Sequence, residues 1–458
     1  MNASFGRWLS RASAGLDDVV RSLPADTALV AYVRFMKFVR APGTYPVAMY
    51  AALTLDGPAG RPRLVALGPA SDIEPAVERW RREAGTDPRA GDAAERERIY
   101  RNAAGRLRSL IWDPVAAALR SSRRAIVVPD GAISLVSIGA LAGSDGYLVE
   151  SEPTLHYLGA ERDLVQDSPR AVAGNDLVIV GGPDFDAAPA GRMTAHAGAS
   201  AAARGNQAAP AALRGPRAAC AEFRALRFEP LPRARAEADE VATLWSSFGK
   251  VRKLTGSQAD EVTFKSMAAG ASVLHLSTHA FFMAGACDAA KDPIPTASVT
   301  GTDFENYAAN RPEDALLFSG LALAGANHSQ EGAAREETED GILTAEEISA
   351  LDLSAASWVV LSACETGLGK VLSGEGVLGL RRAFETAGAG TLVMSLWQVE
   401  DDATRAWMTG LYRSRLAGST TADAVRQASL DLLRSRRGRG VSTHPFFWGG
   451  FVASGDWR

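Results

Sequence analysis

The sequence predicts an α/β protein in which a mostly parallel sheet is flanked by helices and follows an α+β region. The first observation is a series of short apolar runs, each ending in small or turn-forming residues, from residue 125 onward. The second is that helical patterns separate these runs, which is the alternation expected of a parallel sheet covered by helices. The third is that the β-rich runs near the start of the chain are joined by short turns, which favours an antiparallel arrangement there.

Residues 1–120 are expected to form an N-terminal α+β accessory region. Its β-rich runs predict an antiparallel meander, and they lie at residues 28–35, 47–55 and 63–67. A helical pattern then continues to Trp80, and a second one runs from residue 93 to residue 119. The meander and these helices account for most of the region.

Residues 121–458 are expected to form the main α/β region. Its strand-like apolar runs lie at residues 125–128, 177–180, 272–276, 358–361 and 391–396. Helical segments lie near residues 234–248, 376–387, 401–416 and 421–433. Residues 187–217, rich in Ala, Gly and Arg, and residues 287–340, rich in Asp, Asn, Glu and Gly, are expected to be flexible insertions.

Composition and charge argue against several classes of function. The chain has 458 residues with 49 basic and 53 acidic side chains, so its net charge of −4 gives no global attraction to nucleic acid or to an anionic membrane. The three cysteines, Cys220, Cys287 and Cys364, form no CxxC pair, which argues against a disulfide framework and a zinc site. Without a signal-peptide pattern or an apolar run of about 18 residues, the chain is expected to be cytoplasmic and to span no membrane.

Two strand ends carry the residues of greatest chemical interest. Ligands and catalytic groups in α/β sheets collect at the carboxyl ends of strands. His279 follows the run at 272–276, and Cys364 follows the run at 358–361. An imidazole beside a cysteine raises the thiolate fraction, which acyl transfer requires. Most free cysteines are buried small hydrophobes and most single histidines are structural, but the polar, glycine-containing residues 365–369 favour an exposed Cys364.

Several stretches resemble one known family. They read VLHLSTHAFF around His279, VVLSACETGLG around Cys364, GEGVLGLRRAFETAGAGTLVMSLWQVED after it, and HPFFWGGFVASG near the end. Weaker similarity extends forward through PLPRARAEADEV and VVPDGAISLVSIGAL, so the resemblance covers roughly residues 20–458. These stretches are similar to the CHAT domain family, caspase-like cysteine peptidases of clan CD that are often attached to tetratricopeptide repeats in bacteria.

The resemblance implies a caspase-haemoglobinase-like fold and peptide-bond hydrolysis by a dyad of His279 and Cys364 through an acyl-enzyme. It implies no third member of a catalytic triad, no cofactor and no metal. The oxyanion would be held by the backbone amides of Cys364 and Ala280. Family members often have glycine at the position of Ala280; the backbone amide survives this change, but the added methyl group limits how closely a substrate approaches.

The resemblance also implies where a protein substrate binds. An extended peptide is expected to pair along Ser395, Leu396 and Trp397 by strand addition. The acidic side chains that follow, Asp401 among them, would either form a pocket for a basic residue or cap the next helix, and capping is the ordinary role of such acids. The insertion at 287–340 leaves the sheet just after His279, so we expect it to act as a flap that an activating protein partner orders.

Other readings fit parts of the sequence. A catalytically silent caspase-like scaffold would bind partners through the insertions, although an intact His279 and Cys364 favour an enzyme. Residues 374–379 match GxGxxG, but no strand directly precedes them, so they are expected to let a loop enter a helix rather than to bind a dinucleotide. His275 and His279 have HxxxH spacing, but they lie in and beyond a strand, so His275 is expected in the core and not at a metal.

Overall fold

The computed structural model describes most of the chain: residues 13–38, 45–119, 122–144, 146–151, 153–165, 174–188, 225–282, 316, 319–329, 339–363 and 375–457. Residues 189–217 of the first expected insertion lie outside these ranges, and so does the predicted nucleophile Cys364. Among the described helices, none is long and apolar enough to cross a membrane.

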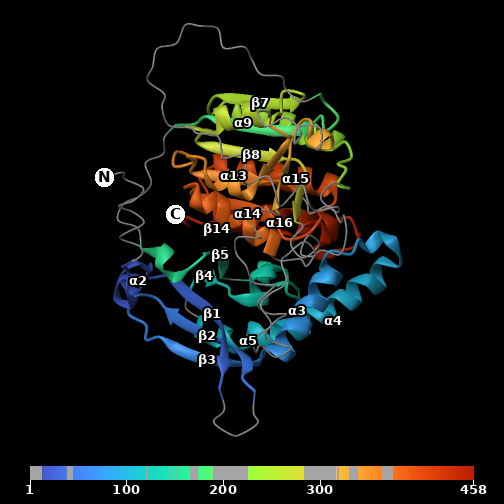
Figure 1. The fold of residues 1–458 in the computed structure, drawn as a ribbon. Helices are drawn as coiled ribbons and strands as arrows, with labels where there is room; N and C mark the ends of the chain where they lie inside the picture. The colour runs from blue at the N-terminus through green and yellow to red at the C-terminus, as the bar shows by residue number, and fades with distance from the viewer. Residues whose placement is uncertain are drawn as a thin grey trace, which may run out of the picture.

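One large sheet runs through the described part of the molecule (Figure 1). From one edge to the other its strands are β3 (Arg63–Pro69), β2 (Val47–Asp56), β1 (Thr27–Lys37), β4 (Arg124–Val128), β5 (Thr154–Tyr157), β14 (Phe451–Gly455), β13 (Thr391–Ser395), β12 (Trp358–Leu361), β8 (Val273–Ser277), β6 (Leu177–Pro183) and β7 (Val251–Gly256). Neighbouring strands are parallel except in β3-β2-β1 and in the β13–β14 pair. The predicted α/β class and the N-terminal antiparallel meander are therefore confirmed.

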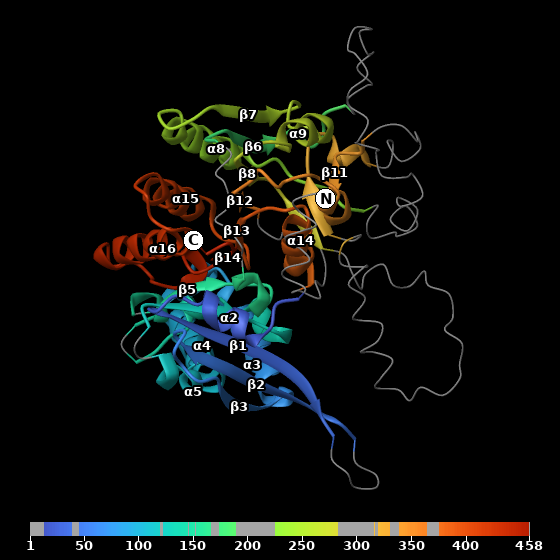
Figure 2. The same ribbon diagram turned by 90° about the vertical axis from the view of Figure 1, so that its left-hand side faces the viewer.

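Helices lie on both faces of this sheet. They are α2 (Leu16–Ser22), α3 (Ala70–Ala84), α4 (Ala93–Ile111), α5 (Asp113–Ala116), α8 (Pro232–Trp245), α9 (Glu261–Ala268), α13 (Ala345–Ser349), α14 (Glu375–Thr386), α15 (Asp401–Leu416) and α16 (Thr421–Gly438). Figure 2 shows α8, α15 and α16 on one side of the central strands and α9 and α14 on the other. Such double coverage buries both faces of the central strands, which is why their sequences are continuous apolar runs.

Strand β1 shows how the sequence builds two cores at once. Its side chains alternate, because successive residues of a strand point to opposite faces. Ala28, Val30 and Tyr32 join the main core with α3 and α4, whereas Leu29 and Ala31 join a smaller core with α2. Strand β1 also pairs in parallel with β4, so the expected N-terminal and main regions share one sheet.

A second, three-stranded antiparallel sheet starts where β8 ends. Its strands are β11 (Ile342–Thr344), β10 (Ser319–Ala322) and β9 (Ala280–Phe282). A single helical turn, η9 (Ala326–His328), follows β10. Both β10 and η9 fall within the range 287–340, where the sequence suggested an irregular insertion. The Ser-Gly-Leu-Ala sequence of β10 has no β-branched residue, and its strand form depends on pairing with β9 and β11.

Burial of His156 predicts a loss of stability in acid. Its side chain is fully buried in β5, its Nε2 lies 2.9 Å from the Gly455 carbonyl oxygen, and burial lowers its pKa from 6.5 to about 4. Between these values only the unfolded chain binds the proton, so stability falls as the pH falls. We expect the free energy of unfolding of the unmodified protein to fall by about 1.4 kcal/mol per pH unit more than that of His156→Gln in this window.

Urea unfolding of both proteins at several pH values measures this difference. The glutamine side chain retains an N–H donor for the Gly455 carbonyl but does not titrate. Equal pH dependence of the two proteins between pH 6.5 and about 4 would contradict the prediction.

Candidate functional site

The two strand ends predicted to carry the catalytic residues are neighbours. Strands β8 and β12 pair in parallel, with Leu276 opposite Leu361, and the Ser362 amide donates to the Leu276 carbonyl oxygen over 2.9 Å. His279 follows β8 by two residues, and the described part of the chain reaches Ala363, directly before Cys364. The sheet therefore brings His279 and the end of β12 to the same edge. Because Cys364 lies outside the described residues, its contact with His279 stays a prediction.

His279 is held in one orientation by a backbone group. Its Nε2 lies 2.8 Å from the carbonyl oxygen of Glu229. A carbonyl oxygen only accepts hydrogen bonds, so Nε2 must carry the proton and the neutral ring keeps Nδ1 as its acceptor. The rings of Phe185 and Phe228 flank the imidazole, with centroid distances of 5.2 and 5.7 Å. The side chain is 5% exposed, so these contacts leave little freedom for the ring to turn.

The surroundings of His279 favour its neutral form. Burial lowers the pKa of the imidazole, and the hydrogen bond to the Glu229 carbonyl and the charges of Glu229 and Asp401 oppose this effect. The net shift is downward, so the ring is neutral at pH 7 and can accept a proton. The base predicted from sequence therefore has the protonation state that a base needs.

The backbone around His279 is fixed by β10. The Ala322 amide donates to the His279 carbonyl oxygen over 2.9 Å, and the Thr278 hydroxyl donates to the Ala322 carbonyl oxygen over 2.5 Å. Ala280, one of the predicted oxyanion donors, is the first residue of β9 and lies opposite Leu321 of β10. Its role toward an oxyanion remains a prediction.

The predicted substrate strand follows β13 and is buried. Ser395, Leu396 and Trp397 are 6 to 7% exposed. The Leu396 amide already donates to the Gly450 carbonyl oxygen over 2.9 Å, and the Ser395 hydroxyl donates to the Trp397 carbonyl oxygen over 2.8 Å. A peptide that pairs here must therefore approach from the side of β12, and this pairing stays a prediction.

The acidic residues at the start of α15 have partners within the chain. Glu400 caps the helix, since its side chain accepts from the Ala403 amide over 2.7 Å, so the expected capping role is confirmed for this residue. Arg233 at the start of α8 lies 2.7 Å from Asp402 and 3.8 Å from Asp401. Burial raises the pKa of Asp401, while Arg233 opposes the shift. A basic substrate residue would have to compete with Arg233 for these carboxylates.

His275 lies in the core, as the sequence suggested. Its side chain is fully buried, with Nε2 2.9 Å from Glu237 and Nδ1 3.0 Å from the Tyr412 hydroxyl. This network joins β8 to α8 and α15. Both ring nitrogens have partners, so His275 does not form a metal pair with His279.

Three carboxylates elsewhere lie close enough together to hold a cation, but a lysine occupies that position. Each of these residues contributes one carboxylate oxygen, and the three oxygens lie within 4.8 Å of one another; the residues are Glu261, Glu339 and Glu347. The Lys265 ammonium group is 3.1 to 3.2 Å from all three carboxylates. This cluster therefore contains its own counter-ion.

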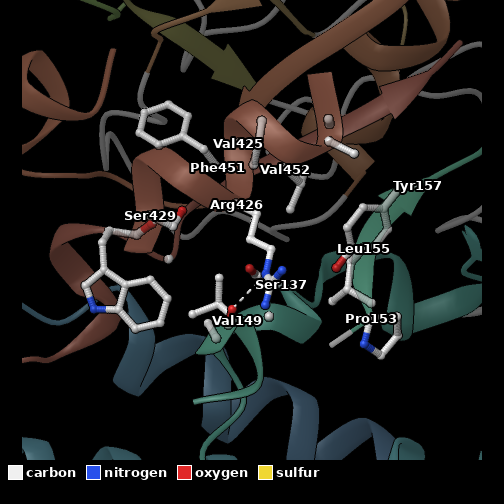
Figure 3. A pocket seen from close by; sticks show the side chains of 16 residues that line it. Ser137, Val149, Pro153, Leu155, Tyr157, Val425, Arg426, Ser429, Phe451 and Val452 are labelled. Atoms are coloured by element: carbon white, nitrogen blue, oxygen red, sulfur yellow. Dashed lines mark hydrogen bonds between the residues drawn. The ribbon is translucent and has the colours of Figure 1, made fainter. Parts of the chain in front are cut away.

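A mainly apolar hollow is lined by residues of α16, β5 and β14 and of the segments before β5 and β14 (Figure 3). Val149, Leu155, Val425 and Phe451 contribute to its lining. The Arg426 side chain enters it and donates to the carbonyl oxygens of Val149 and Ser151, both over 3.0 Å. None of the predicted site residues lines this hollow, and the bonds of Arg426 join α16 to the chain before β5.

Sequence reasoning missed the Glu229 carbonyl as a partner of His279. The resemblance implied no third member beside the dyad, and a backbone carbonyl is present at every position of every sequence. The apolar residues Leu226 and Phe228 could have suggested that the segment before α8 packs into the molecule, and they do belong to a small core with Phe185 and Phe281. They could not indicate which carbonyl faces the imidazole.

Comparisons with known proteins agree with the resemblance. A family model described as "CHAT domain" matches residues 101–456. Tetratricopeptide repeat protein 28 of Homo sapiens is 26% identical over 227 residues, which are 50% of this chain and 8% of that protein. The protein of the same name from Mus musculus is 31% identical over 115 residues, 25% of this chain and 4% of that protein. The chain thus spans less than a tenth of the length of these relatives.

Two solved structures are similar in part. The Arg specific cysteine proteinase gingipain R has a TM-score of 0.41 at 9% identity, with 84% of this chain and 74% of that chain covered. The Saccharomyces cerevisiae separase–securin complex has a TM-score of 0.47 at 8% identity, with 97% of this chain and 31% of that chain covered. Both TM-scores are below 0.5, so neither likeness decides a function for this chain.

Proposed function

Because the chain belongs to the CHAT domain family, we propose that it is a cysteine endopeptidase that cleaves a specific protein partner. Cys364 is the nucleophile and His279 the base. The observation that supports this proposal most is the hydrogen bond from His279 Nε2 to the Glu229 carbonyl, at the edge of the sheet where the strand before Cys364 ends. It leaves Nδ1 as the atom that accepts a proton.

The reaction is acyl transfer to sulfur followed by hydrolysis. His279 Nδ1 takes the proton of the Cys364 thiol, and the sulfur attacks the peptide carbonyl carbon. The amides of Cys364 and Ala280 donate to the oxyanion, and the imidazolium returns its proton to the leaving amine. Water then attacks the thioester, with His279 again as the base, and releases the second product and the free thiol.

The other predicted residues have roles in substrate binding. Ser395, Leu396 and Trp397 pair with the extended substrate, and Asp401 influences the choice of the residue beside the cut. An activating protein partner acts through the part of residues 287–340 that lies outside the described residues, since β10 within this range already pairs with β9 and β11. In the alternative function, the chain is a silent scaffold that uses the same fold to bind partners.

The alkylation rates of the three cysteines distinguish the proposed peptidase function from the alternative scaffold function. At pH 7 we expect iodoacetamide to label Cys364 at least about tenfold faster than Cys220 and Cys287, because the imidazole stabilises the thiolate. His279→Ala is expected to remove this difference, and the other two cysteines of the same variant serve as the internal control. Peptide mapping by mass spectrometry measures all three rates. If iodoacetamide labels Cys364 no faster than Cys220 and Cys287, and His279→Ala does not change this rate, the scaffold function is favoured.

A further inference from the structure

Asn327 contacts both aromatic residues that flank the proposed base, through their backbones. It lies in η9, between β10 and β11. Its Oδ1 accepts from the Phe228 amide over 2.8 Å, and its Nδ2 donates to the Phe228 carbonyl oxygen over 3.1 Å. Its own backbone amide donates to the Phe185 carbonyl oxygen over 2.9 Å. One residue therefore binds the backbones of two segments that are far apart in the sequence.

The Asn327 side chain acts toward Phe228 as a neighbouring strand would. An amide side chain offers one acceptor and two donors, so it can satisfy both backbone groups of a single residue. The second Nδ2 hydrogen is directed to the Asp186 carboxylate, whose Oδ1 is 2.8 Å away. The side chain is thus itself fixed between the chain at Asp186 and the chain at Phe228.

The residue after Phe228 supplies the hydrogen-bond acceptor for His279. The planar peptide unit that joins Phe228 to Glu229 contains the Phe228 carbonyl that Asn327 binds, so this contact fixes the Glu229 amide and Cα, to which the Glu229 carbonyl is attached. The Glu229 carbonyl oxygen accepts the hydrogen bond from His279 Nε2–H. The ring contacts of Phe185 and Phe228 with the imidazole depend on the same two backbone segments. No bond of Asn327 reaches His279 directly, so its influence passes through these neighbours.

We propose that Asn327 is a positioning residue for the catalytic base: its amide clamps the Phe228 backbone and thereby keeps the Glu229 carbonyl on His279 Nε2. This proposal rests on the proposed peptidase function for its effect on catalysis. This role explains why the Asn327 side-chain amide makes two hydrogen bonds to the Phe228 backbone and a third to Asp186. Without the clamp, the Glu229 carbonyl moves and His279 populates the tautomer that carries its proton on Nδ1. In that tautomer Nδ1 is already protonated, so it cannot accept the proton of the Cys364 thiol.

Asn327→Ala and Asn327→Asp test the clamp in the full chain. The alanine variant removes every side-chain bond, whereas the aspartate variant keeps nearly the same shape and the acceptor for the Phe228 amide but loses both Nδ2 donations. Asn175→Ala is the matched control, because Asn175 Nδ2 also donates to a distant backbone carbonyl, that of Phe248, over 3.2 Å. Thermal unfolding verifies that each variant is folded, and Asn327→Asp decides the question if Asn327→Ala does not fold.

Two measurements are made on each protein. The ¹⁵N chemical shifts of the His279 ring report the tautomer, and iodoacetamide labelling across pH reports the thiolate fraction of Cys364. We expect the Asn327 variants to shift His279 away from the Nε2–H tautomer and to slow labelling of Cys364 at pH 7 by about five- to tenfold, the change that loss of one or two hydrogen bonds produces. Asn175→Ala is expected to stay within about twofold of the unmodified protein.

The outcomes separate this proposal from the proposed function. A folded Asn327 variant with an unchanged His279 tautomer overturns the clamp, whatever the chemistry of Cys364. A shifted tautomer supports the clamp, and slower Cys364 labelling extends its effect to the thiol. If Cys364 of the unmodified protein labels at an ordinary rate that His279→Ala does not change, the peptidase function fails, while the tautomer measurement still decides whether Asn327 positions His279.

Discussion

Replacing Cys364 with alanine is expected to lower cleavage of the protein partner by at least about a thousandfold, because no other group in the proposed mechanism can form the acyl-enzyme. His279→Ala keeps the thiol but removes the base, and we expect a loss of about a hundredfold or more. Residues of one dyad act as a unit, so the double variant should be no slower than Cys364→Ala alone.

Mass spectrometry of new peptide termini measures this effect. Proteins from the same cell are incubated with the unmodified chain and with each variant, in the presence and absence of candidate activating partners. A chain that carries both Cys220→Ser and Cys287→Ser is the matched control and should yield the same termini as the unmodified chain. Termini that persist in full with Cys364→Ala would show that another nucleophile makes the cut and would remove Cys364 from the mechanism.

Lys265→Met is expected to destabilise the fold by about 3 to 5 kcal/mol at pH 7, which is the usual cost of removing one partner from a buried ion pair. The Glu261 side chain has no exposed surface, and its Oε1 lies 3.2 Å from the Lys265 ammonium group. Burial opposes the charge of Lys265, yet the surrounding carboxylates raise its pKa. Methionine fills a similar volume, so the loss reports the charge rather than a cavity.

The loss of folding stability in Lys265→Met is expected to depend on pH in one direction. Burial raises the pKa of Glu261 well above its ordinary value even with Lys265 present. A carboxyl group with a raised pKa in the folded chain stabilises the fold at low pH and loses that contribution as the pH rises through its pKa. The defect of Lys265→Met should therefore shrink when the pH is lowered from 7 toward 5.

Urea unfolding of Lys265→Met and of Lys253→Met makes the comparison. Lys253 pairs with Asp239, and both side chains are more than a third exposed, so its loss should cost less than about 1 kcal/mol. Equal losses for the two variants, or a Lys265→Met defect that grows in acid, would contradict the interpretation of Lys265 as the internal counter-ion of this cluster.

Much of the architecture could be predicted from sequence because buried parallel strands have a strong signature. Strand β12 matches its predicted range of 358–361, and β8 is displaced by one residue from the range 272–276. Strand β7 was missed because it is an edge strand. Its sequence, VRKLTG, has Lys253 exposed and only Leu254 buried, so it lacks a continuous apolar run.

The sequence by itself determined which strands carry His279 and Cys364 and placed each residue just beyond a strand end, because chain order and hydrophobic pattern are local properties. Only the tertiary structure decided that β8 and β12 are adjacent, since pairing between distant segments depends on the packing of the whole sheet. It also decided that the Glu229 carbonyl holds His279 and that Asn327 holds Phe228. Backbone groups are chemically alike at nearly every position, so their partners follow from three-dimensional placement and not from residue identity.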